Sequence, residues 1–226
     1  MIVSISQPTL FPWIGYFNII KKSDAFVFLD TVKFEKHSWQ MRNKLKEISK
    51  VQEHPVWIRI PTRVEKTDTL IKDVIIDNMQ SWKEAHLKSF QANYGDSYRE
   101  IEFINNLYYK QWNNLSEFNI EFISKCCEYL DIHTRLLKSS KLKCVGKKGD
   151  LVLNICKELD ATDYLSTVGS ADYLEDYRYR FDESGIKIIY HDYTHPIYRQ
   201  RGKTFIENLS ILDLIFNEKN NAKNFV

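Results

Sequence analysis

Residues 2–30 read IVSISQPTLFPWIGYFNIIKKSDAFVFLD, and this stretch decides the fold that the sequence predicts. Two short apolar runs, at 2–6 and 25–29, flank an amphipathic segment at 13–24. Short β-rich runs on either side of a helical segment are typical of a strand–helix–strand unit. The run at 25–29 is apolar at every position, which indicates a strand buried on both faces, as in a parallel sheet.

The rest of the chain extends this pattern. Segments 133–140, 150–161, 163–167, 170–185 and 186–193 alternate strand, helix, strand, helix and strand, which favours right-handed crossovers and a parallel sheet. A hairpin over 44–61 with its turn at 50–54, and a strand at 73–77, precede three helical segments at 79–95, 97–114 and 115–131. We expect the closing helix, 209–217, to dock on the sheet and the tail, 218–224, to be frayed.

These segments predict one α/β domain over residues 1–226. Its sheet is mainly parallel and Rossmann-like, and 79–131 forms a helical insertion within it. A length of 226 residues is enough for one sizeable core, and a hydrophobic content of 43% with 27% charged residues excludes a disordered chain.

Charge and cysteine content limit the partners that we expect. The net charge of +2 gives no field that would attract nucleic acid, and no apolar run reaches the roughly 18 residues of a membrane span. The four cysteines match no zinc-site spacing, so no metal is predicted. Adjacent Cys126 and Cys127 lie in an apolar helical pattern, which favours buried free thiols. We therefore expect a cytoplasmic protein.

Polar residues follow the first two predicted strands directly. Gln7 ends the first and Asp30 the second, and ligands of parallel sheets bind where loops leave the carboxyl ends of strands. A carboxylate at that edge can act as a base, hold a metal or anchor a substrate amine or hydroxyl. The alternative is that Asp30 caps its own loop.

A basic and aromatic loop follows Asp30. Segment 32–43, VKFEKHSWQMRN, offers a guanidinium fork for anions, an indole for stacking and a histidine that can titrate near neutrality. The alternative is a solvated surface loop. The residues that we expect to bind substrate here are Lys36, His37, Trp39, Arg42 and Asn43.

His86 lies four residues after Trp82 and four before Phe90, so all three share one helix face. It is therefore either a proton-transfer group or a core histidine whose hydrogen bonds are satisfied.

Later loops supply further candidates. Ser139, Ser140 and Lys147 lie between a strand and a helix, where an anion can bind; Ser170 follows the next strand, where capping alone also explains it. Tyr198 and Gln200 follow the last strand, and with Trp13 they suggest a polar and aromatic cleft. No Walker A, HExxH or GxGxxG motif occurs, and no Ser-His-Asp order.

Several of these stretches together resemble the WbqC-like proteins. They are QPTLFPWIGYF, SDAFVFLDTVKF, SWQMRN, KEAHLKSFQANYG, the Ser139-Ser140 pair, YLSTVGSADYL and PIYRQ with LSILDLIFN, and the resemblance runs from Gln7 to about Asn217. It implies a role in bacterial O-antigen or related surface-polysaccharide synthesis, with transfer of an aminoacyl group such as glycyl onto a sugar. Lys33 and Met41 depart from the family pattern. The positions that match it are Gln7, Pro8, Pro12, Trp13, Gly15, Tyr16, Asp30, Trp39, Arg42, Asn43, His86, Tyr94 and Gln200.

A remoter likeness concerns the fold alone. The apolar strand, proline-containing loop and GYFNIIKKSDAFVFLD resemble the opening of the HIGH-type nucleotidyltransferases, with Tyr16 in place of the histidine that would touch phosphate.

The leading hypothesis is an enzyme that acts on a small molecule, either a sugar nucleotide or an activated acyl donor, the latter free or on a carrier protein. Asp30 or His86 would take a proton at a site shared with Gln7, and Trp13, Tyr16 and Trp39 would stack on the substrate. The sequence identifies no cofactor. The alternatives are a nucleotidyltransferase and a non-catalytic binding or assembly partner in the same pathway.

Overall fold

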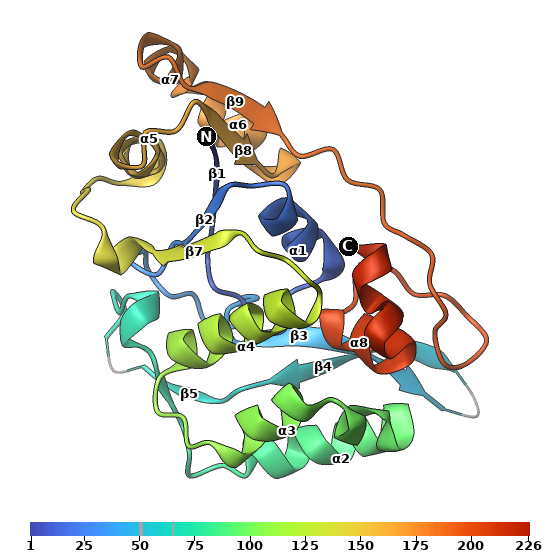
Figure 1. The fold of residues 1–226 in the computed structure, drawn as a ribbon. Helices are drawn as coiled ribbons and strands as arrows, with labels where there is room; N and C mark the ends of the chain where they lie inside the picture. Colours follow the sequence, from blue (N-terminus) through green and yellow to red (C-terminus); the bar gives the residue numbers. More distant parts are fainter. Residues whose placement is uncertain (50–51, 65) are drawn as a thin grey trace.

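A five-stranded parallel sheet forms the centre of one half of the molecule in the computed structural model, which describes residues 1–49, 52–64 and 66–226 (Figure 1). The spatial order of its strands is β7-β2-β1-β8-β9. The five strands are β1 (Ile2–Ser6), β2 (Ala25–Phe28), β7 (Arg135–Lys138), β8 (Asp163–Ser166) and β9 (Lys187–Tyr190). Counted along the chain, this is the order 3-2-1-4-5 of Rossmann-like sheets, and the predicted fold class is confirmed.

The strand order reverses between β1 and β8. The chain moves outward from β1 to β2 and β7 on one side, then crosses to β8 and β9 on the other. With right-handed crossovers, the connections on the two sides must cover opposite faces of the sheet. The loops that leave β1 and β8 diverge at this point, and parallel sheets bind ligands in the crevice that results.

Two apolar clusters lie on the two faces, which explains why β2 is buried at every residue, as predicted. Helices α5 (Lys148–Glu158), α6 (Ala171–Glu175) and α7 (Arg178–Glu183) contribute to one cluster, and α1 (Ile14–Lys21) to the other. The sequence predicts a single helix over 170–185, but α6 and α7 are separate. The break includes Tyr177, whose ring lies so close to Gly149 of α5 that no Cβ would fit there.

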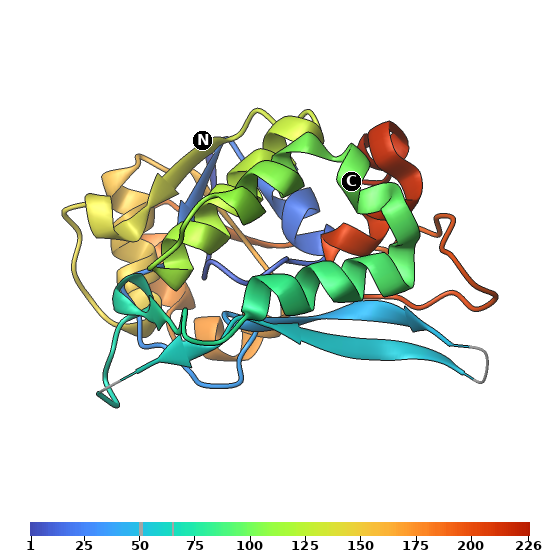
Figure 2. The same ribbon diagram turned by 90° about the horizontal axis from the view of Figure 1, so that it is seen from below.

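The second half of the molecule is a hairpin covered by helices. Strands β3 (Arg42–Ile48) and β4 (Glu53–Arg59) pair antiparallel, which confirms the predicted hairpin; residues 50 and 51 of its predicted turn lie outside the described residues. Figure 2 shows this hairpin running along one edge of the molecule beside α2 (Trp82–Tyr94). The remaining elements here are β5 (Thr62–Arg63), η1 (Ile71–Asp73), β6 (Ile75–Ile76), η2 (Gly95–Glu100), α3 (Glu102–Tyr109) and α4 (Leu115–Tyr129).

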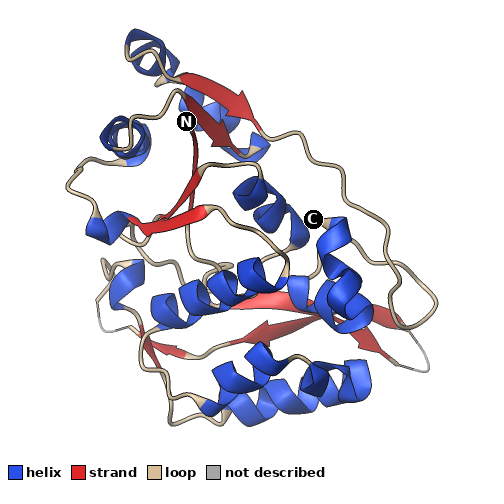
Figure 3. Cartoon of the chain, viewed as in Figure 1, coloured by secondary structure: helices blue, strands red, loops and turns tan. Residues whose placement is uncertain are grey.

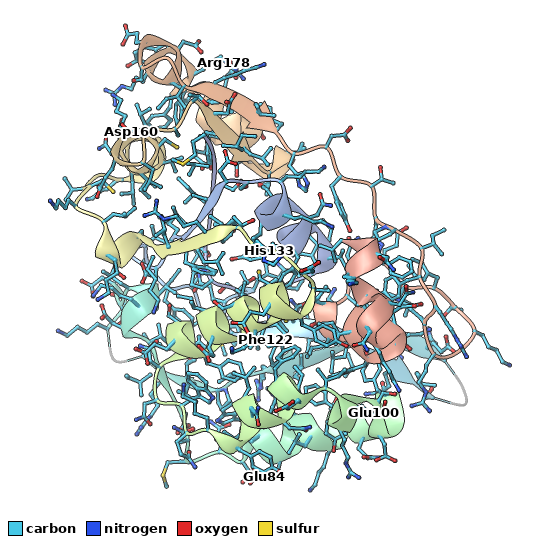
Figure 4. All side chains as sticks on the ribbon, in the orientation of Figure 1. Glu84, Glu100, Phe122, His133, Asp160 and Arg178 are labelled. Carbon is cyan, nitrogen blue, oxygen red and sulfur yellow. The ribbon has the colours of Figure 1, made fainter. Side chains whose placement is uncertain are left out.

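The interior of this half is aromatic. Phe122 of α4 is fully buried, and its ring centroid lies 4.7 Å from that of Phe11 in an edge-to-face arrangement. Figure 4 labels Phe122 within this layer, while Glu84 and Glu100 lie at its outer edge. The predicted inward stripe of α4, which includes Phe118 and Cys126, is confirmed.

The C-terminal helix does not dock on the parallel sheet as predicted. Helix α8 (Ile211–Glu218) packs against β3 and η2. Its Phe216 ring also meets the rings of Phe90 and Tyr94 on α2. The tail is not frayed either. It forms the 3₁₀ helix η5 (Lys219–Phe225), which buries Ala222 completely. The sequence pattern showed that α8 is apolar but not which layer would cover it.

Candidate functional site

A cavity of about 610 Å³ lies at the switch point of the sheet. It is formed by the end of β1, the first turn of α1, the loops after β8 and β9, and part of the 38–43 segment. Both ends of the long loop between β9 and α8, drawn in tan in Figure 3, contribute to it. The lining residues are Ser6, Thr9, Pro12, Trp13, Gly15, Tyr16, Ile19, Trp39, Asn43, Thr167, Val168, Gly169, His191, Asp192, Tyr193 and Asn208.

The loop between β1 and α1 is held rigidly from behind. The Asn43 side-chain amide donates to the carbonyls of Leu10 and Phe11, at 2.9 and 2.8 Å, and Asn119 donates to the Pro8 carbonyl at 3.1 Å. Phe11 has a φ of 45°, which is unusual for a bulky residue. Such a backbone conformation persists only where its surroundings enforce it, and these amide contacts do so. The cavity wall is therefore preorganised.

Trp13 lies directly before α1 and folds back over the first turn of that helix. A Cβ at Gly15 would lie 2.4 Å from the indole, so the close approach requires glycine. The Trp13 ring packs edge-to-face against the Tyr193 ring, with centroids 5.1 Å apart. It lies nearly parallel to the His195 ring, with centroids 6.5 Å apart. These three rings form an aromatic wall, and Trp13 remains 36% exposed.

A Gly15→Ala substitution tests this wall. Because Gly15 lies in a helix, alanine alone would favour the helix by about 1 kcal/mol, so any loss must come from the displaced indole. We expect the intrinsic tryptophan fluorescence to change and ligand affinity at the cavity to fall about ten-fold, with the fold retained in circular dichroism spectra. Unchanged affinity would show that Trp13 does not contact the ligand. Lys88→Ala is the control, because Lys88 is exposed on α2 and does not line the cavity, so the affinity and the fluorescence should stay unchanged.

His191 is the titratable base in the cavity. It follows β9 directly, is 7% exposed, and its Nε2 lies 2.7 Å from the Asn18 side-chain oxygen. An amide oxygen only accepts hydrogen bonds, so Nε2 carries the proton and Nδ1 keeps its lone pair. Burial lowers the pKa of His191 below its ordinary 6.5, and the Lys22 ammonium adds to this, while Asp192 opposes it. The neutral imidazole is therefore the main form at pH 7.

Two tyrosines of the cavity stay protonated. Burial raises the pKa of Tyr16 and of Tyr193 well above the usual value. The Tyr16 hydroxyl donates to the Gln7 carbonyl at 3.0 Å. The Tyr193 hydroxyl is buried and has no hydrogen-bond partner among the described residues.

The charge of the lining is low. Asp192 is its exposed carboxylate, and no Lys or Arg is found in the part of the lining that the structure describes. Thr9, Thr167 and Asn208 add hydroxyl and amide groups to a lining that also contains aromatic rings. Neutral donors and acceptors beside aromatic rings suit a hydroxyl-rich, weakly charged molecule such as a sugar.

Comparison with known proteins agrees with the sequence resemblance. The family model described as "WbqC-like protein family" matches residues 7–225. The chain belongs to this family. It is also 32% identical over 221 residues to the "Uncharacterized protein Rv1507c" of Mycobacterium tuberculosis, a match that covers 95% of this chain and 93% of that protein. No solved structure gives a significant match.

Four residues that the sequence singled out for this WbqC-like chain do line the cavity. Trp13, Tyr16 and Trp39 supply its aromatic surface, and Asn43 lines it while holding the loop behind it. Gln7 is not among the lining residues. Its side-chain oxygen accepts from Gln40 at 2.8 Å, which ties the first loop to the 38–41 segment. The described lining of this cavity therefore contains neither Gln7 nor Asp30, contrary to the expectation that the two share it.

Asp30 occupies a separate hydrogen-bonded cluster between the ends of β2 and β7. It is 2% exposed, and its carboxylate accepts from Ser139 Oγ at 2.8 Å and from Ser140 N and Oγ at 2.8 and 2.6 Å. The two serines that were expected to bind substrate are thus partners of Asp30. The carboxylate therefore anchors the segment after β7, and not its own loop, which was the alternative interpretation of Asp30.

His86 matches its own alternative, that of a core histidine. Its Nε2 donates to the Arg59 carbonyl and its Nδ1 accepts from the Tyr108 hydroxyl, both at 2.8 Å. Burial lowers the pKa of His86 to about 4, so the ring is neutral. Trp82 and Phe90 pack around it, as the spacing predicts.

The other expected substrate contacts lie outside the cavity lining. Tyr198 donates to the buried carboxylate of Asp213 at 2.7 Å, and Gln200 bonds Tyr198 and the Ile206 backbone. Arg42 stacks on Trp57. The remaining members of this group are Lys36, His37 and Lys147, which are exposed, and Ser170, which pairs with Thr167 at 3.2 Å.

The sequence analysis missed His191, Asp192 and Asn18. The signal was present for His191, because it follows an apolar strand directly, as Gln7 and Asp30 do. Asn18 could not be paired with it, since 173 residues separate the two.

Among the described residues, no group of three or more His, Cys, Asp or Glu residues could hold a metal ion. None of the helices in that part of the chain is long and apolar enough to cross a membrane.

Proposed function

We propose that this protein transfers an acyl group, such as a glycyl group, onto an amine or hydroxyl of a sugar or sugar nucleotide in bacterial surface-polysaccharide synthesis. The observation that supports it most is the neutral His191 imidazole, held by Asn18 in a cavity at the switch point of the sheet, where none of the described lining residues is Lys or Arg. Membership of the WbqC-like family adds the expectation of a role in surface-glycan assembly.

The sugar would lie in the cavity against the aromatic wall. The apolar face of a sugar ring packs well on an indole, which Trp13 offers, while Thr9 and Asn208 hydrogen-bond its hydroxyls. Asp192 would hold a protonated amine or a hydroxyl at the rim. The neutral contacts of Trp13, Thr9 and Asn208 bind the sugar ring without the desolvation cost of a buried ion.

His191 would act as the proton acceptor. As the sugar amine or hydroxyl attacks the acyl carbon, a C–N or C–O bond forms and Nδ1 takes the proton. The bond from the acyl carbon to the leaving group of the donor then breaks, and the imidazolium returns the proton to that leaving group.

The nucleotidyltransferase alternative has less support. A triphosphate needs cations and free backbone donors at the start of α1, but the Trp13 indole covers this turn and the Tyr16 hydroxyl is bonded to Gln7. The lining described by the structure also contributes no Lys or Arg.

Product analysis tests the proposal. The protein is incubated with UDP-linked amino sugars and with a glycyl donor, either glycyl-coenzyme A or a glycyl-loaded carrier protein. The products are separated by chromatography, and their masses are measured by mass spectrometry. We expect an acylated sugar nucleotide that does not form without the protein. Failure of every donor and acceptor pair, together with pyrophosphate release from a nucleoside triphosphate and a sugar phosphate, would contradict acyl transfer and support nucleotidyl transfer.

A further inference from the structure

A cationic and aromatic surface lies on the outer face of the β3–β4 hairpin. It consists of Trp39, Arg42, Lys44, Trp57 and Arg59, which we call the hairpin platform. Arg42, Lys44, Trp57 and Arg59 share one face because Arg42 pairs with Arg59 and Lys44 with Trp57 in the antiparallel ladder. The opposite face carries Leu45 and Ile58 into the core.

The two indoles hold the cations in place. The Arg42 guanidinium lies 4.2 Å from the centroid of the Trp57 ring, and Lys44 Nζ lies 5.0 Å from Trp57 and 6.0 Å from Trp39. The Trp39 and Trp57 rings are 5.5 Å apart, and both are about half exposed, at 50% and 46%. Large exposed aromatics with ordered cations are a feature of binding surfaces rather than of ordinary protein surface.

The charges of the platform are not balanced within the described residues. Arg42, Lys44 and Arg59 take part in none of the ion pairs found over 1–49, 52–64 and 66–226. Lys46, on the same face, shows the contrast, because Glu53 lies 3.1 Å from its Nζ and it is 1% exposed. Arg42 and Arg59 lie directly opposite each other in the strand pair. Like charges in such positions repel each other and destabilise the pairing. A bound anion would remove this repulsion.

The platform is continuous with the cavity. Trp39 belongs to both, since it lines the cavity and packs against Trp57. A molecule with a neutral part in the cavity and an anionic part outside it would cross the rim at Trp39.

We propose that the hairpin platform binds the nucleoside 5′-diphosphate part of a substrate whose reacting group lies in the cavity. The base stacks on the exposed indole of Trp39, and the diphosphate contacts Arg42, Lys44 and Arg59. This inference rests on the proposed function for the reacting group, and it adds the site for the activating group. The same chemistry occurs in a nucleotide-linked sugar acceptor and in an acyl-coenzyme A donor.

Binding measurements by titration calorimetry test the platform without any transfer reaction. UDP, ADP, coenzyme A and uridine are titrated into the wild-type protein and into an Arg42→Gln/Lys44→Gln double variant. We expect the variant to bind UDP or coenzyme A at least about ten-fold more weakly, because charge-assisted hydrogen bonds to phosphate are lost, and to bind uridine unchanged. Salt should weaken the wild-type diphosphate affinity. Preference for UDP would identify the sugar nucleotide as the source, and preference for coenzyme A the acyl donor.

A Lys88→Gln/Lys187→Gln double variant is the control, because it removes the same charge from exposed positions outside the platform. Equal losses of affinity in the two double variants, no diphosphate binding at millimolar concentration, or tighter binding of a single-stranded oligonucleotide than of any diphosphate would overturn the proposal. UDP binding that depends on Arg42 and Lys44, with no acyl transfer detected, would preserve the platform and refute only the proposed reaction.

Discussion

A His191→Gln substitution should lower kcat for acyl transfer by about 10² to 10⁴, the range in which a positioned general base contributes. Glutamine can still donate a hydrogen bond to the Asn18 oxygen from its amide nitrogen, so the loop after β9 should keep its position. It cannot accept a proton at neutral pH. We therefore expect KM to change little while kcat falls, measured by initial rates of acylated sugar formation.

The pH dependence separates this role from a structural one. Because the pKa of His191 is lowered below 6.5, the ring stays unprotonated, and active as a base, down to a pH below 6.5. The acid limb of the profile of kcat/KM against pH should lie there in the wild-type protein and be absent from the residual activity of the variant.

His133→Gln provides the matched control, since His133 is a surface residue whose side chain is 86% exposed. It should leave both kcat and the pH profile unchanged. A His191→Gln protein that keeps the wild-type rate and acid limb would remove His191 from the mechanism.

An Asp30→Ala substitution should lower the free energy of unfolding by about 3 kcal/mol. The change leaves both polar groups of Ser140 without their acceptor and removes one of the hydrogen bonds of Ser139 Oγ, and each unpaired buried group costs about 1–3 kcal/mol, partly recovered where water enters. Chemical denaturation measures this loss. At denaturant concentrations too low to unfold it, the Asp30→Ala protein should retain the wild-type kcat, because Asp30 does not line the cavity.

Asp182→Ala serves as the control for Asp30, since Asp182 is exposed on α7 and surface changes usually alter stability by less than about 0.5 kcal/mol. An Asp30→Ala protein with wild-type stability but no activity would restore the sequence-based hypothesis that Asp30 takes the proton.

The sheet could be predicted because its strands carry local signals. The all-apolar run at 25–28 indicates burial on both faces whatever its neighbours are, and the alternation after residue 133 indicates parallel pairing. The position of α8 could not be predicted, because its apolar residues fit equally well on the sheet or on the hairpin layer.

The candidate site shows the same limit. The strand-end rule selected Gln7 and Asp30 correctly as polar residues at the sheet edge, but the order of the strands decides which ends meet a cavity. Asp30 follows β2, whose outer neighbour is β7, so it meets Ser139 rather than the crevice between β1 and β8. His191 satisfies the same rule at β9. The sequence does not show that β8 and β9 lie on the far side of β1.

A crystal structure of the protein soaked with a UDP-linked amino sugar tests the central claim most directly. We predict electron density for the sugar between Trp13 and His191, with the attacking amine or hydroxyl within hydrogen-bond distance of His191 Nδ1. Density for the sugar beside Asp30 or against His86, with the space between Trp13 and His191 left to solvent, would contradict it.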